Sequence, residues 1–325
     1  MCPSFDWNLG SRSLALGERT LVMGILNVTP DSFSDGGLYH SADAAIAHGL
    51  ALLDEGADIL DIGGESTRPG TPTEAASAGS HAPALAGAVS AQQEMERILP
   101  VIEAIRRQRP SAVLSIDTYK AQVAEAAIRA GTEIVNDVSG FTWDAAMAST
   151  IARLGCAAIL MHTRGLPHEW RSQPAAPDIV SLVREELRAG AARALDHGIS
   201  RRALVLDPGF GFGKNFDENY PLLARFSELH SLGYPLLAAV SRKSFLGRTV
   251  YQRLAQIGDQ VEPSPLAADS SATVPPAARD TATLAATVAA ALAGAHIVRV
   301  HAVRQAVEAL AIADAILAAQ RSAGL

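Results

Sequence analysis

Eight short apolar runs, separated by longer stretches with helical periodicity, constrain the fold of this chain more than any other feature. The runs are residues 21–28, 59–64, 113–118, 133–138, 157–163, 203–209, 235–241 and 296–301. Between them lie alanine-rich stretches with apolar residues at helical spacing, for example residues 42–57, 94–109, 119–131, 179–198 and 281–294. Such alternation is typical of parallel sheets built from βα units. Eight units predict one α/β domain, a closed (β/α)8 or TIM barrel.

Each apolar run ends in a polar side chain. These strand-end residues are Asn27, Asp61, Asp117, Asn136, His162, Asp207, Ser241 and His301. In a parallel barrel the carboxyl ends of all strands lie on one rim, which is where enzymes with this fold carry their active sites. We therefore expect the polar residues to converge on one mouth. An open, doubly wound sheet is the alternative, but it would not collect every strand end around a single site.

The length of the chain, 325 residues with 48% hydrophobic content, suits one barrel domain with a large core. We expect the barrel to span residues 21–321, with residues 1–20 as a lead-in whose few apolar side chains cover the barrel bottom. Two stretches interrupt the alternation, at residues 71–91 and 252–279, and their composition predicts flexible loops on the active-site side. We favour surface insertions over a dedicated lid for both.

Charge and cysteine content exclude several classes of partner. The formal net charge is −7 and the basic residues are scattered, so a nucleic-acid-binding surface is not expected. The chain has 2 cysteines, too few for a disulfide framework, which fits a reducing cytoplasm. No window approaches the roughly 18 uninterrupted apolar residues of a membrane span. The sequence therefore predicts a soluble cytoplasmic protein with no nucleic-acid or membrane partner.

Three strand ends suggest a site for a flat heterocycle. Asp117, Asn136 and Asp207 could meet such a ring edge-on, because the carboxylates accept from its N–H groups and the amide both donates and accepts. Buried carboxylates that face each other without a ligand or a cation would be costly, which argues against a purely structural role. For Asp61 and Glu65 we favour ion pairs within the rim.

A cationic group is expected beside this acidic one. Lys243 follows the seventh strand, and Arg299 and His301 lie two residues apart on the eighth, so their side chains point to the same face. Loops after the last two strands of such barrels frequently bind anions, and a diphosphate would fit this charge. A structural histidine is the alternative for His301. Arg242 alternates with Lys243 and is expected to face outward or to cap the strand.

Two glycine-containing loops leave alternatives open. Asn27 precedes a flexible loop, where its amide oxygen could bind Mg2+ or the side chain could merely cap the loop. Residues 207–214 (DPGFGFGK) do not fit the phosphate-binding pattern G-x-x-x-x-G-K-[ST], since Asn215 follows Lys214. The turn could bring Phe212 beside an aromatic ligand, or Phe210 and Phe212 could simply pack in the core.

Taken together, these segments resemble the dihydropteroate synthase family. The matching motifs are residues 24–37 (GILNVTPDSFSDGG), 64–70 (GESTRPG), 115–118 (SIDT), 136–137 (ND), 207–214 (DPGFGFGK), 241–247 (SRKSFLG) and 299–301 (RVH). The resemblance spans about residues 20–321. It implies a transferase of folate biosynthesis that joins 6-hydroxymethyl-7,8-dihydropterin diphosphate to p-aminobenzoate and releases pyrophosphate. It further implies Mg2+, a dissociative mechanism and a homodimer.

The resemblance also assigns roles to residues. The implied pterin-binding residues are Asp117, Asn136, Met161, Asp207, Phe212 and Lys243. The implied diphosphate-binding residues are Asn27, Arg68, Arg299 and His301, with Asn27 as the metal ligand. The implied p-aminobenzoate-binding residues are Phe33, Thr67, Pro69, Ser241 and Lys243. Four of these would be catalytic, namely Asp117, Lys243, Arg299 and His301.

Two other functions are compatible with part of this pattern. A pterin-binding methyltransferase that uses methyltetrahydrofolate would share the barrel and the acidic residues, but it has no diphosphate to bind. A catalytically inactive pterin-binding scaffold would be expected to lack a site residue, and none is missing. One departure from the family pattern is Ala302, where the family commonly has an aspartate after the last histidine.

Overall fold

The computed structural model describes residues 3–29, 37–66, 73–74, 88–258 and 272–323. Its main sheet has eight strands, all parallel, in the order β8-β7-β6-β5-β4-β3-β10-β9. The bounds are β3 (Leu21–Asn27), β4 (Ile59–Gly63), β5 (Val113–Asp117), β6 (Ile134–Asp137), β7 (Ala157–Met161), β8 (Leu204–Asp207), β9 (Leu237–Ala238) and β10 (Ile297–Val300). A parallel bridge between Leu206 and Leu236 joins β8 to the residue before β9. The expected (β/α)8 barrel is confirmed.

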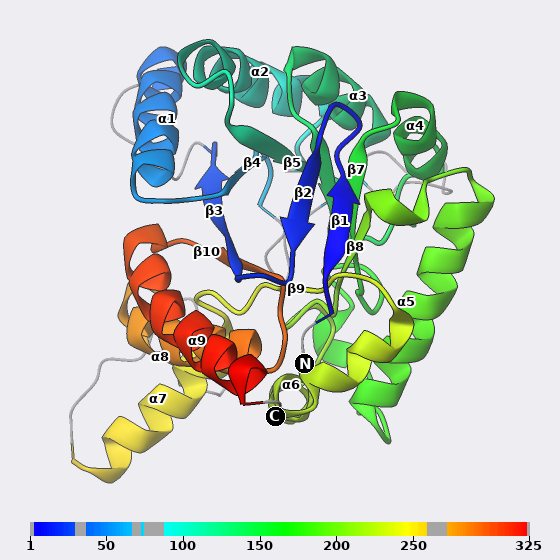
Figure 1. Cartoon of the computed structure of the whole chain (residues 1–325). Helices are drawn as coiled ribbons and strands as arrows, with labels where there is room; N and C mark the ends of the chain where they lie inside the picture. Colours follow the sequence, from blue (N-terminus) through cyan, green and yellow to red (C-terminus); the bar gives the residue numbers. More distant parts are fainter. Residues whose placement is uncertain (1–2, 30–36, 67–72, 75–87, 259–271, 324–325) are drawn as a thin grey trace.

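Helices follow the strands and surround them (Figure 1). They are α1 (Gly37–Asp54), α2 (Ala91–Gln108), α3 (Ala121–Ala130), α4 (Met147–Leu154), α5 (Ile179–Asp196), α6 (Phe216–Ala224), α7 (Ser244–Gln256), α8 (Asp280–Leu292) and α9 (Val303–Ser322). One expected boundary is corrected, because α7 continues to Gln256 and residues 276–279 form the 3-10 helix η6 (Pro276–Arg279). Most of α7 lies before residue 252, so its helical periodicity is not visible in the stretch 252–279 alone. No helix of the described part of the chain is long and apolar enough to cross a membrane.

A β-hairpin lies at the amino-terminal end of the barrel. Strands β1 (Phe5–Asn8) and β2 (Ser13–Leu16) pair antiparallel and lie across the ring of strands in Figure 1. Trp7 is fully buried, and its indole N–H donates to the carbonyl of Ala203 at 2.9 Å. The hairpin packs on the inward-facing apolar residues of the barrel, which form a core separate from the one between strands and helices. The barrel is therefore filled and covered at this end.

Candidate active site

Four strands bring the acidic strand-end residues to one guanidinium group. Arg299 of β10 donates from Nε to Asp61 of β4 and from a terminal nitrogen to Asp117 of β5, both at 2.6 Å. Asn136 of β6 donates to the same oxygen of Asp61 at 2.9 Å. Parallel register explains the cluster, because Gly63, Asp117 and Asn136 lie at one level of three neighbouring strands. We call these four residues (Asp61, Asp117, Asn136 and Arg299) the acidic cluster.

The carboxylates of the acidic cluster are only partly satisfied. Asp61 is fully buried, and its Oδ1 has no hydrogen-bond partner among the described residues. The same holds for the hydroxyl of Ser115, which is in register with Asp61 on β5. Burial raises the pKa of Asp117 to about 7, although Arg299 opposes the shift. The cluster therefore keeps acceptor capacity that a ligand with N–H groups can use.

The third predicted carboxylate, Asp207, lies at the end of β8 and interacts with Lys243. One oxygen of Asp207 accepts the N–H of Gly209 at 2.7 Å. Burial raises the pKa of Asp207 to about 6, and the same effect lowers the pKa of Lys243 to about 8. Each residue limits the shift of the other, and Arg299 and Asp117 also act on Lys243. Acidic and cationic strand ends thus meet in one mouth.

The glycine-rich loop after β8 decides between the two roles left open for its phenylalanines. Phe210 is fully buried and stacks between Phe226 and Phe245, with ring centroids 6.4 Å from each. Phe212 instead contacts Lys243, whose ammonium lies 3.9 Å from the ring centroid. The backbone requires glycine at residue 209, where φ is +66° and a Cβ would lie 2.0 Å from a carbonyl oxygen. Phe210 is a core residue, whereas Phe212 faces the site.

Lys214 is buried beneath this loop, and its ammonium group is hydrogen-bonded to the loop itself. Its ammonium group donates to the carbonyls of Gly209 and Phe212, at 2.7 and 3.2 Å, and contacts His162 Nδ1 at 2.9 Å. His162 in turn is 2.8 Å from Glu186 of α5. Burial lowers the pKa of Lys214 to about 7 and that of His162 to about 4. This pairing could not be predicted from the sequence, because Lys214 and His162 lie on different loops.

Ser241 and His301 meet at the ends of the last two strands. The hydroxyl of Ser241 accepts the backbone N–H of His301 at 3.2 Å and lies 2.9 Å from its Nδ1. Burial and the nearby Arg242, Arg299 and Lys243 lower the pKa of His301 to about 3. His301 is therefore neutral at physiological pH. It can offer an anion a hydrogen bond but no charge.

Arg242 turns the chain between Ser241 and Lys243. Its φ of +56° is unusual for a residue other than glycine. The side chain of Arg242 forms an ion pair with Asp280 at the start of α8, and its backbone N–H donates to the hydroxyl of Thr283. The side chain thus points away from Lys243 toward α8, in keeping with the outward orientation expected.

The structure describes some of the remaining predicted site residues and not others. Asn27 ends β3, is half-buried, and its side chain has no hydrogen-bond partner in the described part of the chain. Met161 is buried at the end of β7. Four predicted residues lie outside the described residues: Phe33, Thr67, Arg68 and Pro69.

A second buried cluster beside the site was missed by the sequence analysis. Lys120 lies between Glu65 and Glu94, at 2.6 and 2.7 Å, and also donates to the carbonyl of Val89. The hydroxyl of Tyr119 donates to Glu65 at 3.2 Å. An ion pair had been expected for Glu65, but its lysine partner had not been identified. Lys120 lies two residues after the SIDT motif, and this nearness is the sequence signal that could have drawn attention to it.

Comparisons with known proteins agree with this geometry. A model of the family "Pterin binding enzyme" matches residues 23–301. The dihydropteroate synthase of Escherichia coli K12 is 39% identical over 301 residues, which cover 93% of each chain. This chain belongs to the dihydropteroate synthase family. The family member from Mycobacterium leprae is 42% identical over 297 residues, which cover 91% of this chain and 93% of the relative.

Solved structures of dihydropteroate synthases share the whole fold. The Xanthomonas albilineans enzyme with 4-aminobenzoic acid is 38% identical, with a TM-score of 0.79 over 98% of this chain and 99% of that one. The same enzyme in complex with 7,8-dihydropteroate gives 35% identity and a TM-score of 0.77, over 97% of this chain and 99% of that one. The family expected from the motifs is confirmed.

The departure from the dihydropteroate synthase pattern at Ala302 has a local consequence. Ala302 is the residue before α9, and its side chain cannot cap the first turn of this helix. The carboxylate of Glu55 accepts the backbone N–H of Arg304 in that turn at 3.3 Å. Aspartate at the position of Ala302 would accept a further free backbone N–H and stabilise the helix. Ala302 thus leaves one helix start beside His301 without a cap of its own.

Proposed function

We propose that this chain joins 6-hydroxymethyl-7,8-dihydropterin diphosphate to p-aminobenzoate, giving 7,8-dihydropteroate and pyrophosphate. It is a transferase of folate biosynthesis, like the dihydropteroate synthases to which it is related. One observation of the structure supports the proposal independently of the relationship to known dihydropteroate synthases. The acidic cluster and Asp207, which suit a pterin ring, share one mouth with Lys243 and His301, which suit an anion.

In this proposal the ring binds edge-on to Asp117, Asn136 and Asp207. The raised pKa of both carboxylates lets each accept or donate a proton near neutral pH, which matches a ring with several N–H and N positions. Met161 and Phe212 line the ring. Lys243 borders both the pterin and p-aminobenzoate, with Ser241 beside the latter. Phe33, Thr67 and Pro69 complete the p-aminobenzoate site by family resemblance.

The diphosphate is proposed to lie beside Arg299 and His301. Arg299 is the connection between the two halves of the substrate, since it contacts Asp61 and Asp117 and can also face an anion. With the hydroxyl of Ser241 donating to Nδ1, His301 carries its ring proton on Nε2 and can donate it to a phosphate oxygen. Charge that develops on departing pyrophosphate is stabilised by these donors. Arg68 would add a further contact.

Asn27 is the residue that would hold Mg2+. An amide oxygen without a hydrogen-bond partner among the described residues, at a strand end on the rim, fits a cation that prefers oxygen ligands. The metal would supply positive charge to the leaving diphosphate when bound. No general base is required in the proposed dissociative route, because the arylamine is neutral and already nucleophilic.

The proposal includes a homodimer in the cytoplasm. A dimer is implied by family resemblance, and it is supported by two exposed isoleucines, Ile312 and Ile316, that lie one turn apart on α9. No nucleic acid or membrane partner is proposed, and the substrates are small molecules. Related structures with 4-aminobenzoic acid and with a sulfonamide drug are consistent with this choice of ligand class.

The assay for the proposal uses the purified full-length chain with Mg2+, dihydropterin diphosphate and p-aminobenzoate. We expect pyrophosphate release and the appearance of 7,8-dihydropteroate by mass spectrometry. The alternative, methyl transfer from methyltetrahydrofolate, is measured on the same preparation and should give no product. A folded protein that forms neither pyrophosphate nor dihydropteroate would reject the proposed function.

A further inference from the structure

The loop between β7 and α5 places a tryptophan behind Phe212. Trp170 begins the 3-10 helix η3 (Trp170–Ser172), and only 4% of its surface is exposed. Its ring lies 4.9 Å from the Phe212 ring, with an interplanar angle of 82°. Its indole N–H donates to the carbonyl of Gly165 at 3.2 Å, which fixes the orientation of the ring. Trp170 is thus a buried and oriented contact of a residue that faces the site.

Phe212 in turn contacts Lys243. The ammonium group of Lys243 lies 3.9 Å from the centroid of the Phe212 ring, within the range of a cation–π interaction. No hydrogen bond or ion pair fixes this ammonium group among the described residues, although Asp207, Asp117 and Arg299 act on its charge. The Phe212 ring therefore supports the end of the Lys243 side chain.

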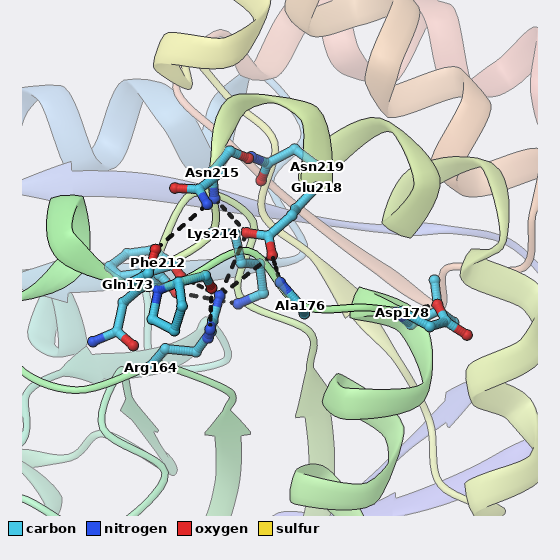
Figure 2. Close-up of polar contacts among 12 residues, drawn as sticks. Arg164, Gln173, Ala176, Asp178, Phe212, Lys214, Asn215, Glu218 and Asn219 are labelled. Carbon is cyan, nitrogen blue, oxygen red and sulfur yellow. Dashed lines mark hydrogen bonds and ion pairs between the residues drawn. The ribbon is translucent and has the colours of Figure 1, made fainter.

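Two charged residues tie the Trp170 loop to the Phe212 loop (Figure 2). Arg164 donates to the carbonyl of Gly213 at 3.2 Å and to that of Pro174 at 2.6 Å, and it forms an ion pair with Glu218 at 3.4 Å. Glu218 also accepts the N–H of Ala176 at 2.7 Å. Both charged side chains are at most 10% exposed. Contacts on both sides of Trp170 along the chain thus hold it against Phe212.

We propose that Trp170 is a positioning residue, which holds Phe212 in place and through it sets the position of the Lys243 ammonium group in the active site. The ion pair of Arg164 and Glu218 supports the same arrangement by fixing the two loops to each other. The role rests on the proposed function only in that Lys243 contacts the pterin substrate. Nothing in the contacts of Trp170 requires that it touch a substrate itself.

The direct test measures the titration of Lys243 in the intact protein. Acetylation of Lys243 by a low dose of acetic anhydride is followed by peptide mass spectrometry as a function of pH. In the unaltered chain we expect an apparent pKa near 8. In Trp170→Leu we expect the Phe212 ring to shift and water to reach Lys243. The pKa of Lys243 should then rise toward the ordinary value of about 10.4. Trp170→Phe, which keeps an aromatic ring, should restore most of the shift.

A matched control separates positioning from general destabilisation. Trp7 is likewise buried and donates its indole N–H to a backbone carbonyl, but it lies at the other end of the barrel. Trp7→Leu should lower the melting temperature and leave the Lys243 titration unchanged; if it does not fold, Trp7→Phe takes its place. An unchanged Lys243 pKa in folded Trp170→Leu, or an equal change in the Trp7 variant, would overturn the proposal.

A binding measurement then connects the position of Lys243 to the substrate. Binding of 6-hydroxymethyl-7,8-dihydropterin is measured by calorimetry, and Trp170→Leu should weaken it about threefold to tenfold, the effect of losing one aromatic contact. Equal binding by the unaltered chain and Trp170→Leu counts against the proposal. If the unaltered chain binds no pterin, the proposed function fails, whereas the Lys243 titration still decides the role of Trp170.

Discussion

The amino-terminal and carboxyl-terminal ends of the barrel differ in the kind of side chain that they bury. At the amino-terminal end, the hairpin and its buried tryptophan close an apolar core, and the buried His296 has both ring nitrogens in hydrogen bonds. At the carboxyl-terminal end, charged side chains are packed together, and burial shifts the pKa values of Asp117, Asp207 and Lys243 toward neutrality. One end is built for stability. The other holds polar groups whose hydrogen-bonding capacity is left open for ligands.

Several buried polar atoms at the rim lack hydrogen-bond partners among the described residues. Oδ1 of Asp61 and the hydroxyl of Ser115 are buried without a partner among the described residues, which is costly in a protein that has no use for them. Buried atoms without a partner also occur away from the rim, for example Thr132 Oγ1, but at the rim they lie beside charged groups with shifted pKa values, a combination characteristic of functional sites. Substitutions at the rim should therefore change activity, and substitutions at the hairpin end should change stability.

The largest effect is expected for Arg299→Ala, which leaves Asp61 and Asp117 without their cation. Breaking such a buried pair costs roughly 3–5 kcal/mol of unfolding free energy. The folded-state pKa of Asp117, about 7 with Arg299 present, rises further without it, so the added loss of stability from Asp117 grows as the pH increases above about 7. Calorimetric binding should show a larger loss for the pterin diphosphate than for the bare pterin. Equal losses for the two ligands would contradict the proposed diphosphate contact.

Arg12→Ala is the matched control at the opposite end of the molecule. Arg12 forms an ion pair with Glu133 at 2.5 Å, and the two side chains are 35% and 13% exposed. Arg12 also donates to the carbonyls of Ser111 and Ala112, so its removal should lower the unfolding free energy by about 1–3 kcal/mol. Activity should stay unchanged, measured in the pyrophosphate assay.

Trp7→Ala tests the hairpin end of the barrel in the same way as Arg299→Ala tests the rim. Removing a fully buried tryptophan leaves a cavity and costs roughly 3–5 kcal/mol. Denaturant unfolding should report this loss, while kcat and KM, measured well below the melting temperature, should stay the same. A large drop in kcat of the folded variant would show that the two ends are not independent.

His296 predicts a pH dependence that originates at the hairpin end. Its Nδ1 accepts the N–H of Leu236, and its Nε2 donates to the carbonyl of Pro3, so only the neutral ring fits. Burial lowers its pKa to about 4, and the nearby His230 adds to the shift. The folded state then binds fewer protons than the unfolded one between pH 6.5 and 4. Stability contributed by His296 is therefore complete above about pH 6.5 and is lost as the pH falls toward 4.

The measurement for His296 compares denaturant unfolding of the unaltered chain and His296→Gln from pH 7.5 to 4.5. Glutamine can accept and donate in the same places without titrating in this range. We expect the difference in unfolding free energy between the two proteins to shrink as the pH falls. His162 and His301 contribute slopes of the same sign to both proteins, so a difference independent of pH would contradict the assignment to His296.

The smallest effect is expected at the rim, from Ala302→Asp. An aspartate before α9 supplies the missing N-cap and should raise the unfolding free energy by about 1 kcal/mol. Because the residue adjoins His301, the pyrophosphate assay should be run in parallel. Unchanged activity together with a higher melting temperature would show that some stability at the rim can be gained without affecting the site. No gain in stability would indicate that the helix start is already satisfied.

Much of the site could be predicted from the sequence. The contacts that could not be predicted share one cause. The strand ends at Asp117, Asn136 and Asp207 follow from local periodicity, and the structure places them within about a residue of the expected strand ends. The placement of Lys120 between Glu65 and Glu94 could not be foreseen. Side-chain partners depend on rotamers and on which loops meet, and neither is encoded in the spacing of residues along one segment.

Eight parallel strands and the polar side chain at the end of each follow from the sequence, because apolar periodicity and breaks in it are local properties. Only the folded barrel brings Arg299 into contact with Asp61 and Asp117, which precede it by 238 and 182 residues. It also separated Phe210, in the core, from Phe212, at the site. Closing the barrel brings distant strand ends together, and only there does burial give these charges their shifted pKa values.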